Sequence, residues 1–154
     1  MDEKVESVVP NPLVRLWRWA TDRRGRQTIL FAVIAMFLNA DQNLTGPNLT
    51  QIGVDFGFDN VTTALDVGGY ASAAFWVVGG FSAVFVGWYG DRFDRHALYA
   101  ALVFLGELSC FSTLAVTNFG GFVATRAFTG LSIGGSTPLV YSMVGDLYSD
   151  SERG

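Results

Sequence analysis

The chain has 154 residues, of which 50% are apolar and only 16% are charged, and its formal net charge is −4. A water-soluble domain of this length needs a larger polar surface, so the composition argues against a soluble globular protein. The single cysteine, Cys110, excludes a disulfide framework within the chain.

The first 27 residues precede any long apolar run and include the stretch "NPLVRLWRWATDRRGR". Asn11 is a suitable helix N-cap, and Pro12 suits the first helical position. The apolar residues that follow share one helical face: Leu13, Leu16, Trp17 and Ala20. This pattern predicts an amphipathic helix that lies in the membrane interface. A plain cytoplasmic segment is an equally good interpretation.

Four apolar runs follow, each long enough for the roughly 20 residues that a membrane-spanning helix needs. They span about residues 28–52, 67–90, 97–116 and 119–147. A soluble helical bundle is disfavoured because 154 residues cannot cover four such helices with one another. A cleaved signal peptide is also disfavoured, since no small-residue cleavage site ends the first run. We therefore expect an all-α membrane protein with four transmembrane helices.

Basic residues are unevenly distributed around these runs. Those before the first run are Lys4, Arg15, Arg18, Arg23, Arg24 and Arg26. Arg92 and Arg95 lie between the second and third runs, Arg153 follows the fourth, and the other two loops carry no Lys or Arg. The positive-inside rule then predicts that residues 1–27, the loop at 90–96 and residues 148–154 are cytoplasmic. The expected location is the cytoplasmic (inner) or plasma membrane.

The loop between the second and third runs contains "GWYGDRFDRH". It resembles the signature loop of the major facilitator superfamily, G-x-L-A-D-R-x-G-R-K. The matching residues are Gly87, Asp91, Arg92 and Arg95. Asp94 replaces the second glycine of that pattern, and His96 replaces its last basic residue. The resemblance implies that Asp91 helps to hold the two halves of a transporter together. Gly87 and Gly90 are three residues apart, and this spacing predicts a flat helix face that another helix can approach closely.

A second stretch, "RAFTGLSIGG" in the fourth run, resembles the fourth-helix pattern of the same family, R-x-x-x-G-x-x-x-G-G. The matching residues are Arg126, Gly130, Gly134 and Gly135. Glycines four apart also predict close helix packing on their own. The resemblance implies the first four helices of a twelve-helix fold, so we expect a truncated chain that needs its remaining helices or another copy. A weaker likeness to the spinster-like branch is based on "LNADQNL" and "PLVYSMVGDL".

Three ionisable residues lie within the predicted spans: Asp41, Glu107 and Arg126. At 1.5 Å per residue, Asp41 lies roughly 20 Å from the inner start of its run, and Arg126 roughly 10 Å from the outer start of its own. In a hydrocarbon core about 30 Å thick, these depths are the same layer. We expect Asp41 and Arg126 to face one cavity, where protonation of Asp41 releases Arg126 to bind an anionic substrate group. The alternative is a static structural pair.

Other polar residues of the spans are further candidates. Asn39, Gln42 and Asn43 are predicted to supply hydrogen bonds to a substrate or a cation. Glu107 is a candidate for proton coupling, and its alternative role is a protonated carboxyl group bonded to a neighbouring helix.

These features predict the N-terminal portion of a proton-coupled secondary transporter, a symporter or antiporter, that moves a small organic solute or amphipathic lipid by alternating access. The alternative is a non-transporting four-helix scaffold or regulator derived from a transporter half. Because the chain lacks a phosphate-binding loop, zinc-ligand spacing and a nucleophile–base set, we expect no enzyme activity, cofactor or metal site. The expected partners are the lipid bilayer, the remaining helices and a small-molecule substrate, with no nucleic acid.

Overall fold

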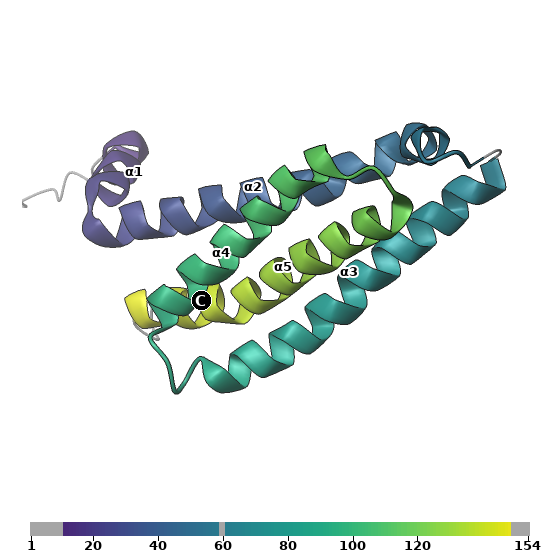
Figure 1. The fold of residues 1–154 in the computed structure, drawn as a ribbon. Helices are drawn as coiled ribbons and strands as arrows, with labels where there is room; N and C mark the ends of the chain where they lie inside the picture. The colour runs from purple at the N-terminus through teal and green to yellow at the C-terminus, as the bar shows by residue number, and fades with distance from the viewer. Residues whose placement is uncertain (1–10, 59–60, 149–154) are drawn as a thin grey trace, which may run out of the picture.

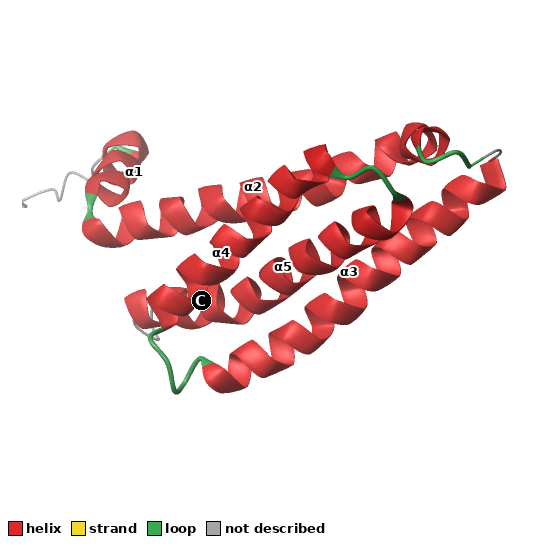
Figure 2. Cartoon of the chain, in the orientation of Figure 1, coloured by secondary structure: helices red, strands yellow, loops and turns green. Residues whose placement is uncertain are grey.

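The structure, a computed structural model, describes residues 11–58 and 61–148, without the side chains of Asp41 and residues 61–65. Within these residues every regular element is helical (Figures 1 and 2). The elements are α1 (Pro12–Thr21), α2 (Arg23–Asp55), α3 (Val61–Tyr89), α4 (Arg95–Ser112), the 3₁₀ turn η1 (Thr113–Ala115) and α5 (Phe119–Leu147). The all-α prediction is therefore confirmed for the described part of the chain.

The long helices α2 to α5 run alternately up and down in an elongated bundle (Figure 1). The start of α2, the α3–α4 loop and the end of α5 lie at one end, which we call the basic end. The end of α2, the start of α3 and the α4–α5 connection lie at the opposite end, which we call the far end. At the basic end, the hydroxyls of Thr28 and Tyr148 are hydrogen-bonded at 2.9 Å, which ties the start of α2 to the end of α5.

Side-chain caps define several helix starts. Asn11 accepts a hydrogen bond from the backbone N–H of Leu13 at 3.0 Å, with Pro12 as the first residue of α1, as the sequence predicts. Asn118 caps α5 in the same way, accepting from Gly121 N–H at 2.8 Å. Because these caps satisfy N–H groups that have no partner within the helix, they fix where each helix begins.

Two helices extend further than their apolar runs indicate. α2 begins at Arg23 rather than near residue 28, and α3 begins at Val61 rather than near residue 67. A helix satisfies its own backbone hydrogen bonds, so it continues past the hydrocarbon layer into polar surroundings without a break. Hydropathy reports the apolar part of such a helix and not its full length.

Large apolar side chains cover the outside of the bundle. Trp76 on α3, Phe104 on α4 and Leu114 in η1 are 70%, 69% and 85% exposed. Three helical segments are long and apolar enough to cross a membrane: Arg23–Asp55, Asp66–Tyr89 and Arg95–Ala115. Apolar surface of this extent is suited to lipid and not to water. The protein is therefore an integral membrane protein.

The fourth predicted span, α5, is not among these three segments within the described residues. Its sequence carries Arg126 together with many Gly, Ser and Thr residues, which lower its hydropathy. α5 is also the most enclosed of the helices, because it packs along both α3 and α4. The prediction of four spans is thus supported by length and composition for α2, α3 and α4.

Glycines allow α3 and α5 to meet backbone to backbone. A Cβ atom at Gly130 would overlap the backbone of Phe75, and one at Gly134 would overlap the backbone of Gly79. A Cβ at Gly135 would lie 2.7 Å from the hydroxyl of Ser82. These contacts place the glycine pattern of α5 at the α3–α5 interface, where small residues permit close helix approach.

Candidate functional site

Arg126 is the most deeply buried charged residue described, with a side chain only 2% exposed. Its Nη1 donates a hydrogen bond to the hydroxyl of Thr45 on α2, and its Nη2 donates to the hydroxyl of Thr113 in η1, both at 3.1 Å. The guanidinium carbon lies 5.4 Å from the ring centroid of Phe122, one turn earlier on α5. Three elements therefore converge on one cation in the far half of the bundle.

Hydroxyl groups continue from Arg126 along the α4–α5 interface. Ser109 donates to the carbonyl of Thr125 at 2.7 Å, and Thr129 donates to the same carbonyl at 3.0 Å. Both side chains are buried. The interior beside Arg126 is therefore polar but uncharged among the described side chains, which lowers the cost of holding a cation there.

Position 41 lies on α2 four residues before Thr45, so the two positions share one face of the helix, one turn apart. The side chain of Asp41 is outside the described residues. The structure nevertheless brings the backbone of α2 at this level close to Arg126, because Thr45 contacts the guanidinium directly. The described contact between α2 and Arg126 is made by Thr45, and the pairing of Asp41 with Arg126 stays a prediction.

A second cluster of charges lies at the basic end, around Arg95. Its Nη2 donates to Asp91 at 3.1 Å, and its Nη1 donates to Asp146 at 3.0 Å and to the hydroxyl of Ser142 at 2.7 Å. Arg95 Nε also donates to the carbonyl of Gly90 at 3.3 Å. One half-buried guanidinium thus joins the end of α3, the start of α4 and the last turns of α5.

The other residues of this loop have local roles. Asp94 caps α4, accepting hydrogen bonds from the N–H groups of His96 and Ala97 at 2.8 and 3.3 Å. A short acceptor side chain such as that of Asp is favoured at an N-cap. Asp94 therefore has a structural role at the position where the family pattern has glycine. The Arg92 guanidinium lies 4.2 Å from the ring centroid of Trp88. A Cβ at Gly90 would lie 3.0 Å from Leu139 of α5, whereas Gly87 faces open space.

Comparison with known proteins decides the family. Residues 28–154 match the profile of the Major Facilitator Superfamily. The chain belongs to this superfamily. No curated protein and no solved structure matches it. The two stretches that carry the resemblance in the sequence, the loop around Arg95 and the helix around Arg126, both lie within the matched residues. Members of this superfamily are transporters.

The polar residues of α2 differ in what they contact. The amide of Asn39 donates to the carbonyl of Ala35 at 2.7 Å, and that of Asn43 donates to the carbonyl of Asn39 at 2.8 Å. The carbonyl oxygen of Gln42 is buried and has no hydrogen-bond partner among the described residues. Asn39 lines a pocket between α2 and α5.

Glu107 is separate from the Arg126 site. It lines an apolar groove of about 440 Å³ between α2 and α4, whose other lining residues include Leu30, Ile34 and Phe104. Its side chain is exposed on the outer surface of the described bundle. The structure therefore does not join Glu107 to Arg126, although both lie within predicted spans.

The sequence did not single out four of the residues that hold the two arginines: Thr45, Thr113, Ser142 and Asp146. The spacing of these residues along their helices indicates part of the arrangement. Thr45 shares a helix face with Asp41, and Ser142 and Asp146 are four residues apart at the basic end of α5. Which hydroxyl turns toward an arginine depends on helix rotation, and hydropathy does not determine this rotation.

Proposed function

We propose that the chain supplies the N-terminal portion of a proton-coupled secondary transporter, which moves a small organic solute or amphipathic lipid by alternating access. The observation that carries the proposal is the enclosure of Arg126 between α2, η1 and α5. A neutral side chain would pack in the interior of a membrane protein at lower cost than a cation. A cation that is kept there therefore commonly serves transport. Membership of a transporter family supports the same role.

α5 is the fourth transmembrane helix in this proposal. It has 29 residues, the same number as α3, and both its connections are made at the ends of the bundle. Thr129 and Ser132 of α5 are fully buried, and Ser132 donates to the carbonyl of Leu102 on α4 at 2.6 Å, so these polar side chains are removed from lipid. The basic end is the cytoplasmic end, because Arg92, Arg95 and the arginines before α2 lie there.

Arg126 and Asp41 form the coupling pair. The hydrogen bond from Arg126 to Thr45 supports this assignment, because position 41 lies one turn away on the same face of α2. When Asp41 takes up a proton, its attraction for Arg126 falls, and the guanidinium becomes available to an anionic group of the substrate. Proton transfer and substrate binding are then linked through one side chain.

Arg95 and Asp91 control the conformation at the cytoplasmic end. The carboxylate of Asp91 is largely exposed while it also accepts from Arg95, so it remains accessible to a second half of the transporter. The contacts of Arg95 with Ser142 and Asp146 keep the loop attached to α5. Movement of α5 is thereby transmitted to the surface that faces the other half.

The test is transport in energised membrane vesicles from cells that express the protein. Radiolabelled uncharged, anionic and cationic amphipathic solutes are first screened for uptake that depends on an imposed pH gradient. The solute that responds is then measured with Asp41→Asn and Arg126→Gln. We expect gradient-driven uptake to be lost in both variants, because each removes one partner of the coupling pair.

Asp55→Asn is the matched control, since it makes the same chemical change on the same helix. Asp55 lies at the far end of α2, where it accepts a hydrogen bond from Gln51 at 3.0 Å, and we expect its variant to transport normally. Undiminished uptake in Asp41→Asn, with the pH dependence of the unmodified protein, rules out the proposed coupling.

A further inference from the structure

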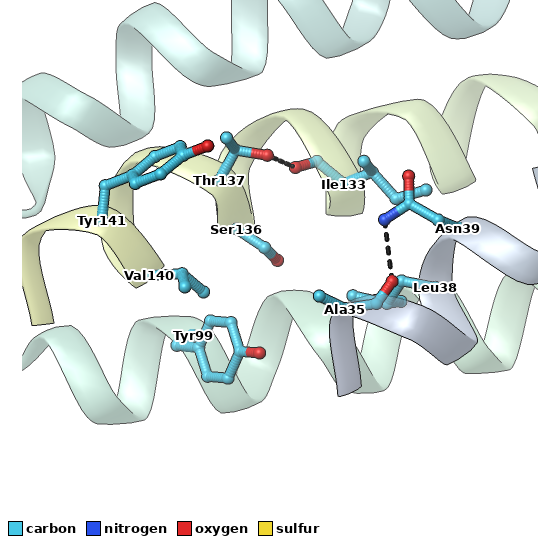
Figure 3. A pocket seen from close by; sticks show the side chains of 9 residues that line it. All are labelled: Ala35, Leu38, Asn39, Tyr99, Ile133, Ser136, Thr137, Val140 and Tyr141. Atoms are coloured by element: carbon cyan, nitrogen blue, oxygen red, sulfur yellow. Dashed lines mark hydrogen bonds between the residues drawn. The ribbon is translucent and has the colours of Figure 1, made fainter. Parts of the chain in front are cut away.

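A pocket of about 250 Å³ lies between α2, α4 and α5, on the basic-end side of Arg126 (Figure 3). Its apolar lining comes from Ala35, Leu38, Ile133 and Val140, and no charged side chain lines it among the described residues. Ile133 follows Arg126 by seven residues on α5, so the pocket lies about 10 Å from the arginine site. Arg126 does not line this pocket.

Two hydroxyl groups in this pocket have no hydrogen-bond partner in the described part of the chain. Tyr99 and Ser136 are only 6% and 4% exposed, and neither hydroxyl is hydrogen-bonded to any described residue. Figure 3 shows both hydroxyls directed toward the space between α2 and α5. A buried polar group without a partner is unfavourable and rare in folded proteins, so two at one pocket need an explanation.

Neighbouring hydroxyls show that Ser136 is an exception on its own helix. Thr137 donates to the carbonyl of Ile133 at 2.8 Å, which is the usual behaviour of Ser and Thr inside helices. Ser132 donates across the interface to the carbonyl of Leu102 at 2.6 Å. Ser136 forms neither kind of bond. Its hydroxyl therefore has a hydrogen-bonding capacity that no described residue uses.

The position of the Tyr99 hydroxyl is fixed by packing. The ring of Phe31 on α2 meets the Tyr99 ring edge-on, with centroids 5.5 Å apart and planes at 87°. Tyr99 also belongs to the buried cluster with Leu102, Leu139 and Met143. Because these contacts restrain the ring, its hydroxyl is held in place before any ligand binds, which lowers the entropy cost of binding.

We infer that this pocket binds an uncharged amphipathic small molecule whose hydroxyl, carbonyl or ether group hydrogen-bonds to Tyr99 and Ser136. Hydroxyls both donate and accept, so they suit any of these groups. The hydrocarbon part of the molecule lies against the apolar side chains of α2 and α5. A charged group is disfavoured, because none of the described lining residues carries an opposite charge that would offset its desolvation. Identification of this molecule with the transported solute rests on the proposed function, but its binding does not.

The probe is azioctanol, a photoreactive diazirine derivative of octanol, with the corresponding diazirine carboxylate as a charged comparison. The full chain is placed in phosphatidylcholine nanodiscs and irradiated over a range of probe concentrations. Mass spectrometry then locates the adducts. We expect saturable labelling at Tyr99 and in residues 133–141, which excess octanol suppresses, and no saturable labelling there by the carboxylate.

Single variants separate binding from photochemical reactivity. Ser136→Ala is read at Tyr99, and Tyr99→Phe is read in residues 133–141, so the labelled side chain remains unchanged in each case. We expect half-saturation to need roughly 2- to 10-fold more probe in each variant, the loss that one neutral hydrogen bond represents. Ser112→Ala is the matched control and should leave labelling of this pocket unchanged, since the Ser112 hydroxyl donates to the carbonyl of Leu108 within α4 at 2.7 Å and Ser112 does not line the pocket.

Thermal unfolding without the probe gives a second, independent reading. Ser136→Ala removes a buried hydroxyl that has no described partner, so the midpoint should stay the same or rise; a fall shows a structural hydroxyl and overturns the inference. Equal labelling of Ser136→Ala and the unmodified chain, or labelling spread evenly over lipid-facing residues such as Phe104, also overturns it. Arg126→Gln should leave pocket labelling intact, so loss of transport and loss of binding are distinguishable.

Discussion

Arg126 depends on hydroxyl groups from two other elements, so its position is sensitive to single substitutions there. Thr45→Val keeps the shape of the side chain and removes the acceptor of the 3.1 Å bond from Nη1. Hydrogen bonds to charged groups contribute about 1.5–3 kcal/mol, and we expect the free energy of unfolding to fall by about that amount. Denaturation in mixed detergent micelles, followed by circular dichroism, measures the change.

Thr137→Val is the control for this residue-scale prediction, because the Thr137 hydroxyl bonds only a carbonyl of its own helix and is exposed. We expect it to change stability by less than about 0.5 kcal/mol. Equal effects of the two variants contradict the argument that Thr45 supports the arginine.

Arg126 and Arg95 could be found in the sequence. Arg126 is a rare charged residue within an apolar run, and Arg95 belongs to a charged loop between two such runs. Their partners could not be found in this way. Thr45 and Thr113 are the same type of residue as Thr137, whose hydroxyl bonds its own helix backbone, and only tertiary packing determines which hydroxyls accept a hydrogen bond from Arg126. The unpartnered hydroxyl of Ser136 is likewise a property of the packed bundle and leaves no trace in hydropathy.

At the scale of helices, the glycines of α5 determine how closely α3 approaches. Gly134→Ala would place a methyl group on the backbone carbonyl of Gly79, which cannot move aside as a flexible side chain would. We expect the α3–α5 pair to separate and stability to fall by about 1–3 kcal/mol or more. The same detergent denaturation measures the loss.

Gly80→Ala is the matched control for the glycine prediction. It makes the same substitution on α3, next to Gly79, but a Cβ there meets no atom within 4 Å. The variant should be neutral or slightly more stable, because alanine has the higher helix propensity. If Gly134→Ala is as well tolerated as Gly80→Ala, the close approach of the two backbones is wrong.

Helix order and helix type could be predicted because both depend on local sequence: apolar runs, caps and turns. The spacing of Gly130 and Gly134 also identified an interface, although not that α3 would occupy it. The limits of α2 and α3 could not be predicted, because their outer turns are polar and only backbone hydrogen bonding marks them. For α1, the sequence correctly predicted the N-cap at Asn11. The contact of this helix with lipid stays a prediction.

Across the whole molecule, charge and hydroxyl groups are arranged by depth. The arginine cluster around Arg95 lies at one end, the enclosed Arg126 lies in the far half, and the uncharged pocket lies between them. A solute that entered from the basic end would meet the pocket before the arginine. The proposed two-part site requires this order, with the uncharged groups of the solute bound in the pocket and the proposed Asp41–Arg126 pair beyond it.

A solute that enters from the cytoplasm meets the pocket before Arg126 only if the basic end is cytoplasmic. Labelling from outside the cell can test this orientation. In a Cys110→Ala background, cysteines replace Phe93 in the α3–α4 loop and Phe58 at the far end. Because arginines flank only the first of these positions, we expect a membrane-impermeant maleimide to label position 58 on intact cells and position 93 only after permeabilisation. The Cys110→Ala chain itself gives the background signal. Preferential labelling of position 93 on intact cells reverses the orientation, and with it the direction from which Asp41 and Arg126 are reached.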